Sequence, residues 1–225
     1  MRASSACAPS RRLHIRATFP DRRTAGALLA DKVRDESAPV VVGIARGGVL
    51  VAQPVAHALG APLDVCVVRK VGHPAQQELA MGAVSSTGEL VLTEHARDVD
   101  LPSLDALILQ AQERARRLEH ELRGDRAPVD LHERTVIIVD DGIATSATML
   151  CAIEAARARG AQRVVCAVPV APADFLERLR AKTDRLIVLV PSAEWHFAVG
   201  RHYADFSEVS DEEVRAALAG ERGAS

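Results

Sequence analysis

Five short runs of apolar, mostly β-branched residues are the feature of this sequence that most restricts its fold. They are Ala38–Ala45, Asp64–Val68, Val136–Val139, Arg163–Val170 and Arg185–Val190. A continuous apolar run of this length is typical of a strand covered on both faces, as in a parallel sheet. Stretches with helical spacing of their apolar residues lie between the runs, at 22–34, 49–59, 104–123 and up to 159. This alternation predicts an α/β fold with a doubly wound, mostly parallel sheet of about five strands.

The composition is that of an ordinary globular domain and argues against several classes of partner. The 225 residues carry a formal net charge of −2, so no basic field attracts nucleic acid or anionic lipid. The four cysteines form no C-x-x-C pair and favour buried, reduced thiols. No apolar stretch is long enough to span a membrane, and the first twelve residues lack the apolar segment of a signal peptide. We therefore expect a cytoplasmic protein in which residues 1–12 form a disordered tail.

Charged residues and glycines follow three of the predicted strands. Arg46, Gly47 and Gly48 follow the first, Arg69 and Lys70 end the second, and Asp140 and Asp141 follow the third. Ligands of doubly wound sheets bind beyond the carboxyl ends of the strands, so we expect these residues to surround one site. Each group alone also has an ordinary explanation, because glycine turns and solvated charges are common at strand ends.

The stretch RTVIIVDDGIATSATML, from Arg134 to Leu150, combines an acidic pair with a loop of small and hydroxylated residues. Small side chains let a ligand approach the backbone, and the N-terminus of the helix that follows favours an anion. The two carboxylates would repel a phosphate and instead suit sugar hydroxyls or Mg²⁺. The joined pattern predicts a site for a phosphorylated sugar, although a turn or a helix N-cap explains either fragment alone.

This stretch resembles the signature of the type I phosphoribosyltransferases, which is a hydrophobic strand, two acidic residues, a short loop and Thr-Gly-x-Thr. Here the strand is Val136–Val139, the acidic pair is Asp140–Asp141, and the last four residues are Thr145-Ser146-Ala147-Thr148. From Phe19 to Phe206 the chain is similar to a bacterial subgroup of predicted phosphoribosyltransferases. It departs from the signature at Ser146, where the family has glycine. A side chain there could crowd the phosphate, force a strained φ or donate a further hydrogen bond.

The resemblance implies one domain over residues 13–210, with a small hood from about 13–36 and 191–210, followed by a C-terminal helix and tail at 211–225. It also implies a Mg²⁺-dependent enzyme that binds phosphoribosyl pyrophosphate (PRPP). The enzyme would transfer the phosphoribosyl group to a nitrogen nucleophile of a small acceptor, such as a nucleobase, and release pyrophosphate. A homodimer is compatible with the resemblance, whereas nucleic-acid and membrane partners are not expected.

The resemblance gives each candidate residue a role. Asp140, Asp141 and Lys70 are the expected catalytic residues, and the two aspartates would also meet the metal indirectly. The 5-phosphate would bind at Ala144, Thr145, Ser146, Ala147 and Thr148, and pyrophosphate at Arg46, Gly47, Gly48, Arg69 and Lys70. The segment Val71–Ala80 matches a mobile loop that closes over the site in this family. Trp195 or Phe197 would stack on the acceptor base.

Three questions stay open at this level. Alanine at position 144 disfavours a 6-oxopurine acceptor, because enzymes of this fold that act on such bases carry aspartate there. Ser146 also fits a PRPP-binding regulator that performs no chemistry. An enzyme acting on another phosphosugar would keep the phosphate loop but would not need Arg46 and Lys70.

Overall fold

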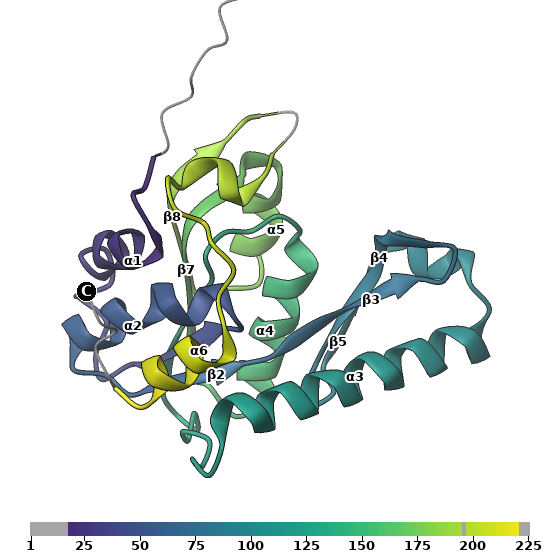
Figure 1. The fold of residues 1–225 in the computed structure, drawn as a ribbon, viewed down its shortest axis with the longest axis horizontal. Coiled ribbons are helices and arrows are strands. Elements are labelled where there is room, and N and C mark those ends of the chain that lie inside the picture. The colour runs from purple at the N-terminus through teal and green to yellow at the C-terminus, as the bar shows by residue number, and fades with distance from the viewer. Residues whose placement is uncertain (1–17, 195–196, 221–225) are drawn as a thin grey trace, which may run out of the picture.

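The centre of the protein is a five-stranded sheet, seen in a computed structural model that describes residues 18–194 and 197–220 (Figure 1). The strand order is β2-β1-β6-β7-β8, and every neighbouring pair is parallel. The strands are β1 (Val40–Ile44), β2 (Leu63–Cys66), β6 (Thr135–Val139), β7 (Arg163–Pro172) and β8 (Arg185–Ser192). The predicted α/β fold with its parallel sheet is confirmed.

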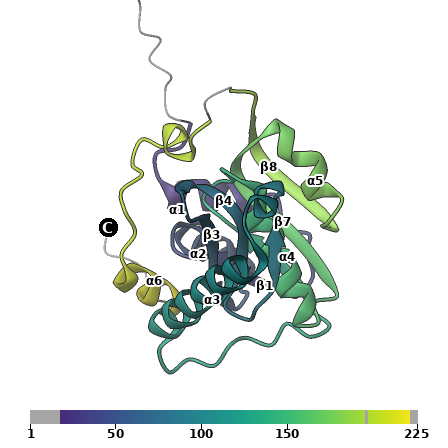
Figure 2. The same ribbon diagram turned by 90° about the vertical axis from the view of Figure 1, so that its right-hand side faces the viewer.

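Helices cover both faces of this sheet (Figure 2). On one face α4 (Ser146–Ala158) and α5 (Leu176–Arg180) pack on strand residues such as Val42 and Ile138. On the other face α1 (Arg22–Ala30) and α2 (Gly47–Leu59) pack on the alternate residues, such as Val41 and Ile137. Because side chains alternate along a strand, only strands that are apolar at every position can fill both layers.

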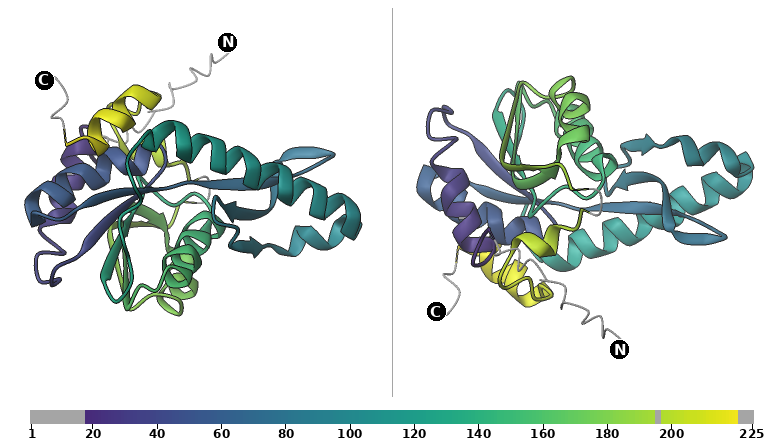
Figure 3. Two further views of the ribbon diagram at one scale, coloured as in Figure 1. Left: turned by 90° about the horizontal axis from the view of Figure 1, so that it is seen from below. Right: turned by 90° about the horizontal axis from the view of Figure 1, so that it is seen from above.

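A second, antiparallel sheet extends away from the first as an arm (Figure 3). It consists of β3 (Val68–His73), β4 (Gln76–Ser85) and β5 (Leu90–Leu92), and α3 (Leu101–Arg123) packs along it after the short 3-10 helix η1 (Glu94–Asp98). A turn at Thr87–Gly88, a dipeptide typical of hairpin turns, joins β4 to β5.

The prediction of a loop over Val71–Ala80 is wrong, because this segment forms the second half of β3 and the first half of β4. Two features hid the strands. The register shifts at Gly72 and His73, which breaks the period of two. The tip of the hairpin is also partly exposed, in contrast to Val71 and Met81, which are buried against α3.

The two ends of the described chain return to the main sheet. Phe19 pairs with Tyr203 in an isolated bridge, just after the 3-10 helix η3 (Val199–His202). The last helix, α6 (Asp211–Leu218), buries its apolar side against α2 and α3 (Figure 3). A further 3-10 helix, η2 (Ala173–Phe175), precedes α5. No helix within the described ranges is long and apolar enough to cross a bilayer.

The cysteines of the described chain are free thiols, as predicted. Cys151 and Cys166 are buried, and Cys66 is half-buried. Burial raises the pKa of all three thiols, that of Cys151 to about 12, so they stay protonated at neutral pH. They therefore act as apolar packing residues.

Candidate active site

The acidic pair lies at the carboxyl end of β6, in the middle of the parallel sheet. Asp140 accepts a hydrogen bond from the backbone N–H of Asp141 (2.9 Å). Burial, together with repulsion from Asp141, raises the pKa of Asp140 well above its ordinary value. Burial also raises the pKa of Asp141, against the opposing effect of Arg22. A cation or a hydroxyl donor placed beside these two crowded carboxyls would stabilise their ionised forms.

Three residues from the chain ends surround Asp141. Arg22, in the first turn of α1, donates from Nε to Asp141 Oδ2 at 2.9 Å, and the side chain of Arg22 is only 11% exposed. The hydroxyl of Tyr203 donates to the backbone carbonyl of Asp141 at 2.6 Å. The ring of Phe206 lies 3.9 Å from the Arg22 guanidinium carbon. These contacts fix the position of the Asp141 carboxylate.

Gly47 and Gly48 lie directly against the acidic pair, although they are more than ninety positions away in the chain. A Cβ atom on Gly47 would lie 1.9 Å from Asp141 Oδ2. A Cβ atom on Gly48 would lie 2.9 Å from the Cα of Asp140. No side chain larger than hydrogen fits at either position. The first and third predicted strand ends therefore form one continuous site, as the sequence suggested.

The two helices that begin at this site, like the short helix α5, lack the side-chain cap hydrogen bond that α1, α3 and α6 have. Asp21, Asp100 and Ser210 cap α1, α3 and α6 with side-chain hydrogen bonds. Neither Arg46 at the start of α2 nor Thr145 at the start of α4 makes such a bond. The ordinary explanation of Thr145 as a capping residue therefore does not apply. The first N–H groups of α2 and α4 are left without a side-chain acceptor and can meet an anion.

Ser146 occupies the first helical position of α4 and is buried. It is not among the residues with positive φ, so the strained backbone considered from the sequence is absent. Ala144, two positions before it, is exposed, whereas Ile143 packs in the core and donates from its N–H to Val170 O at 3.0 Å. The loop between β6 and α4 is thus anchored in the core at Ile143 and accessible to solvent at residues 144 and 145.

The second strand end differs from its prediction, since Arg69 and Lys70 lie within β3 and do not terminate a strand. Both side chains are exposed. Arg69 lines a recess of about 470 Å³ together with Arg46, and Lys70 lines an adjacent recess of about 350 Å³. Arg46, beside a cis peptide bond to Ala45, also donates from Nε to Asp211 Oδ1 at 2.6 Å.

The two aromatic candidates are placed differently. Trp195 lies outside the described residues. Phe197 is half-buried, and its ring centroid lies 5.5 Å from that of His202. His202 is buried, and its Nε2 makes no hydrogen bond within the described part of the chain.

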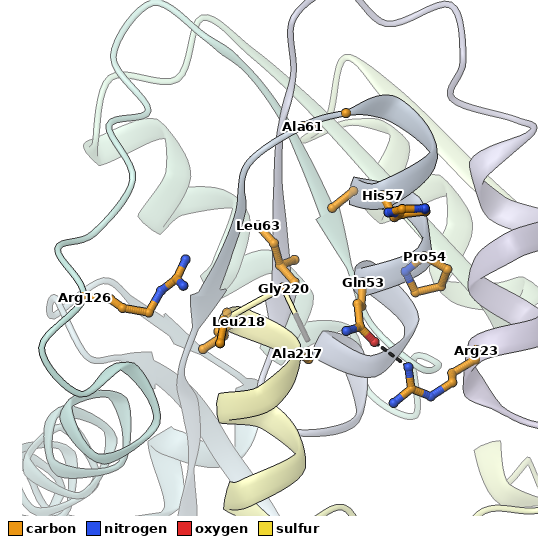
Figure 4. A pocket seen from close by; sticks show the side chains of 13 residues that line it. Arg23, Gln53, Pro54, His57, Ala61, Leu63, Arg126, Ala217, Leu218 and Gly220 are labelled. Carbon is orange, nitrogen blue, oxygen red and sulfur yellow. Dashed lines mark hydrogen bonds between the residues drawn. The ribbon is translucent and has the colours of Figure 1, made fainter. Parts of the chain in front are cut away.

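A separate cavity of about 620 Å³ lies between α2 and the end of α6 (Figure 4). Arg23, His57 and Arg126 lie around an apolar lining that includes Leu63 and Leu218. None of the residues predicted from the sequence lines it, and Leu63 belongs to the amino end of β2. This cavity is therefore not part of the candidate site.

Comparison with known proteins agrees with this geometry. Residues 22–204 match the phosphoribosyl transferase domain, which covers most of the chain. The chain belongs to the phosphoribosyltransferase family. A phosphoribosyltransferase-type protein of Mycobacterium tuberculosis is 44% identical over 207 residues, which are 89% of this chain and 46% of that protein. The crystal structure of a Thermus thermophilus protein is 43% identical, covers 91% of this chain and 99% of its own, and superposes with a TM-score of 0.77.

The family match confirms the resemblance. This phosphoribosyltransferase chain spans about half the length of the curated relatives it matches. Sequence reasoning missed Arg22 and Asp211, because each looked like an ordinary charge in the first turn of a helix. Tyr203 stood out only as one aromatic residue in a chain with few.

Proposed function

We propose that this domain binds PRPP and transfers its phosphoribosyl group to a nitrogen nucleophile of a small acceptor, with release of pyrophosphate. The contact between Gly47 and Asp141 carries the proposal. It brings the glycine loop after β1 against the carboxylates after β6, so a pyrophosphate and a ribose can be bound side by side. PRPP contains these two groups joined at C1 of the ribose.

The 5-phosphate would bind at the start of α4. The N–H groups of its first turn have no side-chain cap, and Thr145 and Thr148 add hydroxyl donors beside them. Hydrogen bonds to a charged phosphate contribute roughly 1.5–3 kcal/mol each, so a few of them suffice for a monophosphate. The helical backbone at Ser146 is compatible with this role, because the serine requires no unusual φ.

The ribose hydroxyls would donate to Asp140 and Asp141. Mg²⁺ fits the same place, because it takes one or two protein carboxylates and completes its shell with water and substrate oxygens. The described residues hold no group of three or more His, Cys, Asp or Glu side chains that could bind a metal alone. The metal would therefore arrive with PRPP, and its charge would favour the ionised form of the crowded carboxyls.

The reaction then depends on positioning and electrostatics. The acceptor nitrogen forms a bond to C1 as the bond from C1 to the pyrophosphate oxygen breaks, and the electron pair leaves with pyrophosphate. Asp140 and Asp141 stabilise the positive charge that develops on the ribose, while Arg46, Arg69 and Lys70 stabilise the charge on the leaving group. Phe197 would stack on the acceptor base, in line with its half-buried ring.

Calorimetric titration with PRPP, ribose 5-phosphate and pyrophosphate, each with and without Mg²⁺, tests the proposal. We expect Mg²⁺-dependent binding of PRPP that is tighter than that of either fragment. Release of pyrophosphate in the presence of candidate bases would then identify the acceptor. Binding of ribose 5-phosphate with no preference for PRPP would contradict the proposal and favour an enzyme of another phosphosugar.

The variant Asp141→Asn probes the assigned ribose and metal contacts. It keeps the shape of the side chain and removes the charge, so we expect at least a ~10-fold loss of Mg²⁺-dependent PRPP affinity. Asp174→Asn is the matched control, because Asp174 is exposed beyond the end of the neighbouring strand β7. Equal PRPP affinity in Asp141→Asn and the wild-type protein would rule out the assigned role.

A further inference from the structure

A recess beside the glycine loop gathers arginines from three parts of the chain. Arg46 comes from the start of α2, Arg69 from β3, and Arg114 and Arg117 from α3. The recess has a volume of about 470 Å³ and is also lined by Gln110, Leu118, Glu113 and Glu121. Sequence reasoning gave α3 no part in binding, because its arginines alternate with glutamates as on a solvated face.

The three neighbouring arginines on this part of α3 differ in whether and how they are paired. Arg116 donates from Nε to Ser86 O at 3.0 Å and so ties the helix to the arm. Arg117 pairs with Glu113 at 3.0 Å on an open surface, where its side chain is 70% exposed. Arg114 makes no hydrogen bond or ion pair with any residue in the described ranges.

Arg46 and Arg69 are also incompletely paired. Arg46 uses only Nε, toward Asp211, and its two terminal nitrogens have no hydrogen-bond partner among the described residues. Arg69 has neither a hydrogen bond nor an ion pair within the same ranges. Burial and repulsion from Arg46 and Arg114 lower the pKa of Arg69. Positive charges thus converge on the recess. The carboxylate of Glu113, which also lines it, is paired with Arg117.

We infer that Arg46, Arg69 and Arg114 form a subsite for the outer phosphate of the pyrophosphate group, and that Arg114 is a binding residue. The inference rests on the proposed function and extends it to α3. A guanidinium matches phosphate oxygens with a fork of donors, so three arginines from separate elements can surround one phosphate group. Arg114 also lines the adjacent recess that contains Lys70, which makes the cationic surface continuous between the two.

Titration with inorganic pyrophosphate and with ribose 5-phosphate tests the inference in three proteins: wild type, Arg114→Gln and Arg178→Gln. We expect Arg114→Gln to bind pyrophosphate about 10-fold or more weakly, because it loses charge-assisted hydrogen bonds. Its affinity for ribose 5-phosphate should be unchanged. Arg178→Gln, the matched control on an exposed position of α5 outside the recess, should stay within about threefold of wild type for both ligands.

Several outcomes would overturn the inference. If Arg114→Gln binds pyrophosphate as the wild type does, Arg114 is not a ligand, although the proposed function stands as long as the wild type binds PRPP. Equal losses in both variants would indicate a diffuse electrostatic field with no subsite. If the wild type binds neither PRPP nor pyrophosphate, the inference and the proposed function fail together. Arg114 is exposed, so thermal melting should show that each variant stays folded.

Discussion

Two aspartates of the parallel sheet show the difference between a buried charge used for stability and one used for binding. Asp64, in β2, is 2% exposed and is fully surrounded by donors. It pairs with Arg123 and Arg159 and accepts hydrogen bonds from two backbone N–H groups. Asp140, at the end of β6, accepts one backbone hydrogen bond and faces a second carboxyl, that of Asp141.

The two sites differ in what the fold supplies. The chain itself satisfies Asp64, so a ligand has nothing to add there. The chain leaves Asp140 in an unfavourable environment, and a metal ion or a pair of hydroxyls would relieve it. Unfavourable carboxyl environments of this kind are typical of functional sites, which are often less stable than the rest of the fold.

The largest effect is expected from Asp64→Ala. The change removes the acceptor of two backbone N–H groups and leaves Arg123, which is 9% exposed, with its ion pair to Glu119 alone among the described residues. Breaking a buried ion-pair network by removing one partner costs about 3–5 kcal/mol of unfolding free energy. Urea denaturation should show this loss, with Mg²⁺-dependent PRPP affinity unchanged in the folded variant. The control Glu113→Gln, in an exposed pair on α3, should cost less than about 1 kcal/mol. A small cost for Asp64→Ala would show that the network is not important for stability.

A moderate effect is expected from Gly47→Ala, which places a methyl group where the Asp141 carboxylate now lies. The carboxylate must move, so we expect at least a ~10-fold loss of PRPP affinity and a stability cost of about 1–3 kcal/mol. The control is Gly60→Ala at the other end of α2, where φ is +58° and nothing lies within 4 Å of the added methyl group. That variant should cost about 1 kcal/mol and bind PRPP normally.

A smaller effect of opposite sign is expected from Asp140→Asn. The pKa of Asp140 is raised in the folded state, so the folded wild type binds more protons than the unfolded chain. Its stability therefore falls as the pH rises from about 3.8 through the raised pKa. The variant lacks this penalty and should melt at a higher temperature at about pH 7, with the difference vanishing near about pH 3. Melting curves over this range check the sign, and a less stable variant at neutral pH would contradict it.

The smallest effect is expected from Tyr203→Phe, which removes one hydrogen bond to the Asp141 carbonyl. The cost should be about 1 kcal/mol of unfolding free energy, with a modest loss of PRPP affinity because Asp141 is less firmly positioned. Denaturation and titration of the same preparation would separate the two effects. A loss of affinity as large as that of Gly47→Ala would mean that the hydroxyl contacts the substrate itself.

The sequence predicted the central sheet well because its strands are apolar at nearly every position, a pattern that few other structures produce. The sequence also predicted that Gly47 and Asp141 lie at one edge of the sheet, because the carboxyl ends of parallel strands meet at the same edge. The outer part of the arm was not predicted, since β3 and β4 shift register at Gly72 and their tip is partly exposed. Arg22 could not be found from the sequence, because a single charge in a helical pattern carries no sign of a contact 119 residues away.

The ion pair between Arg46 and Asp211 has a consequence for the order in which the site is completed during synthesis. The two residues are 165 positions apart, and α6 is made after every strand of both sheets. While the chain grows on the ribosome, the sheet and its glycine loop can therefore assemble before Arg46 meets its carboxylate.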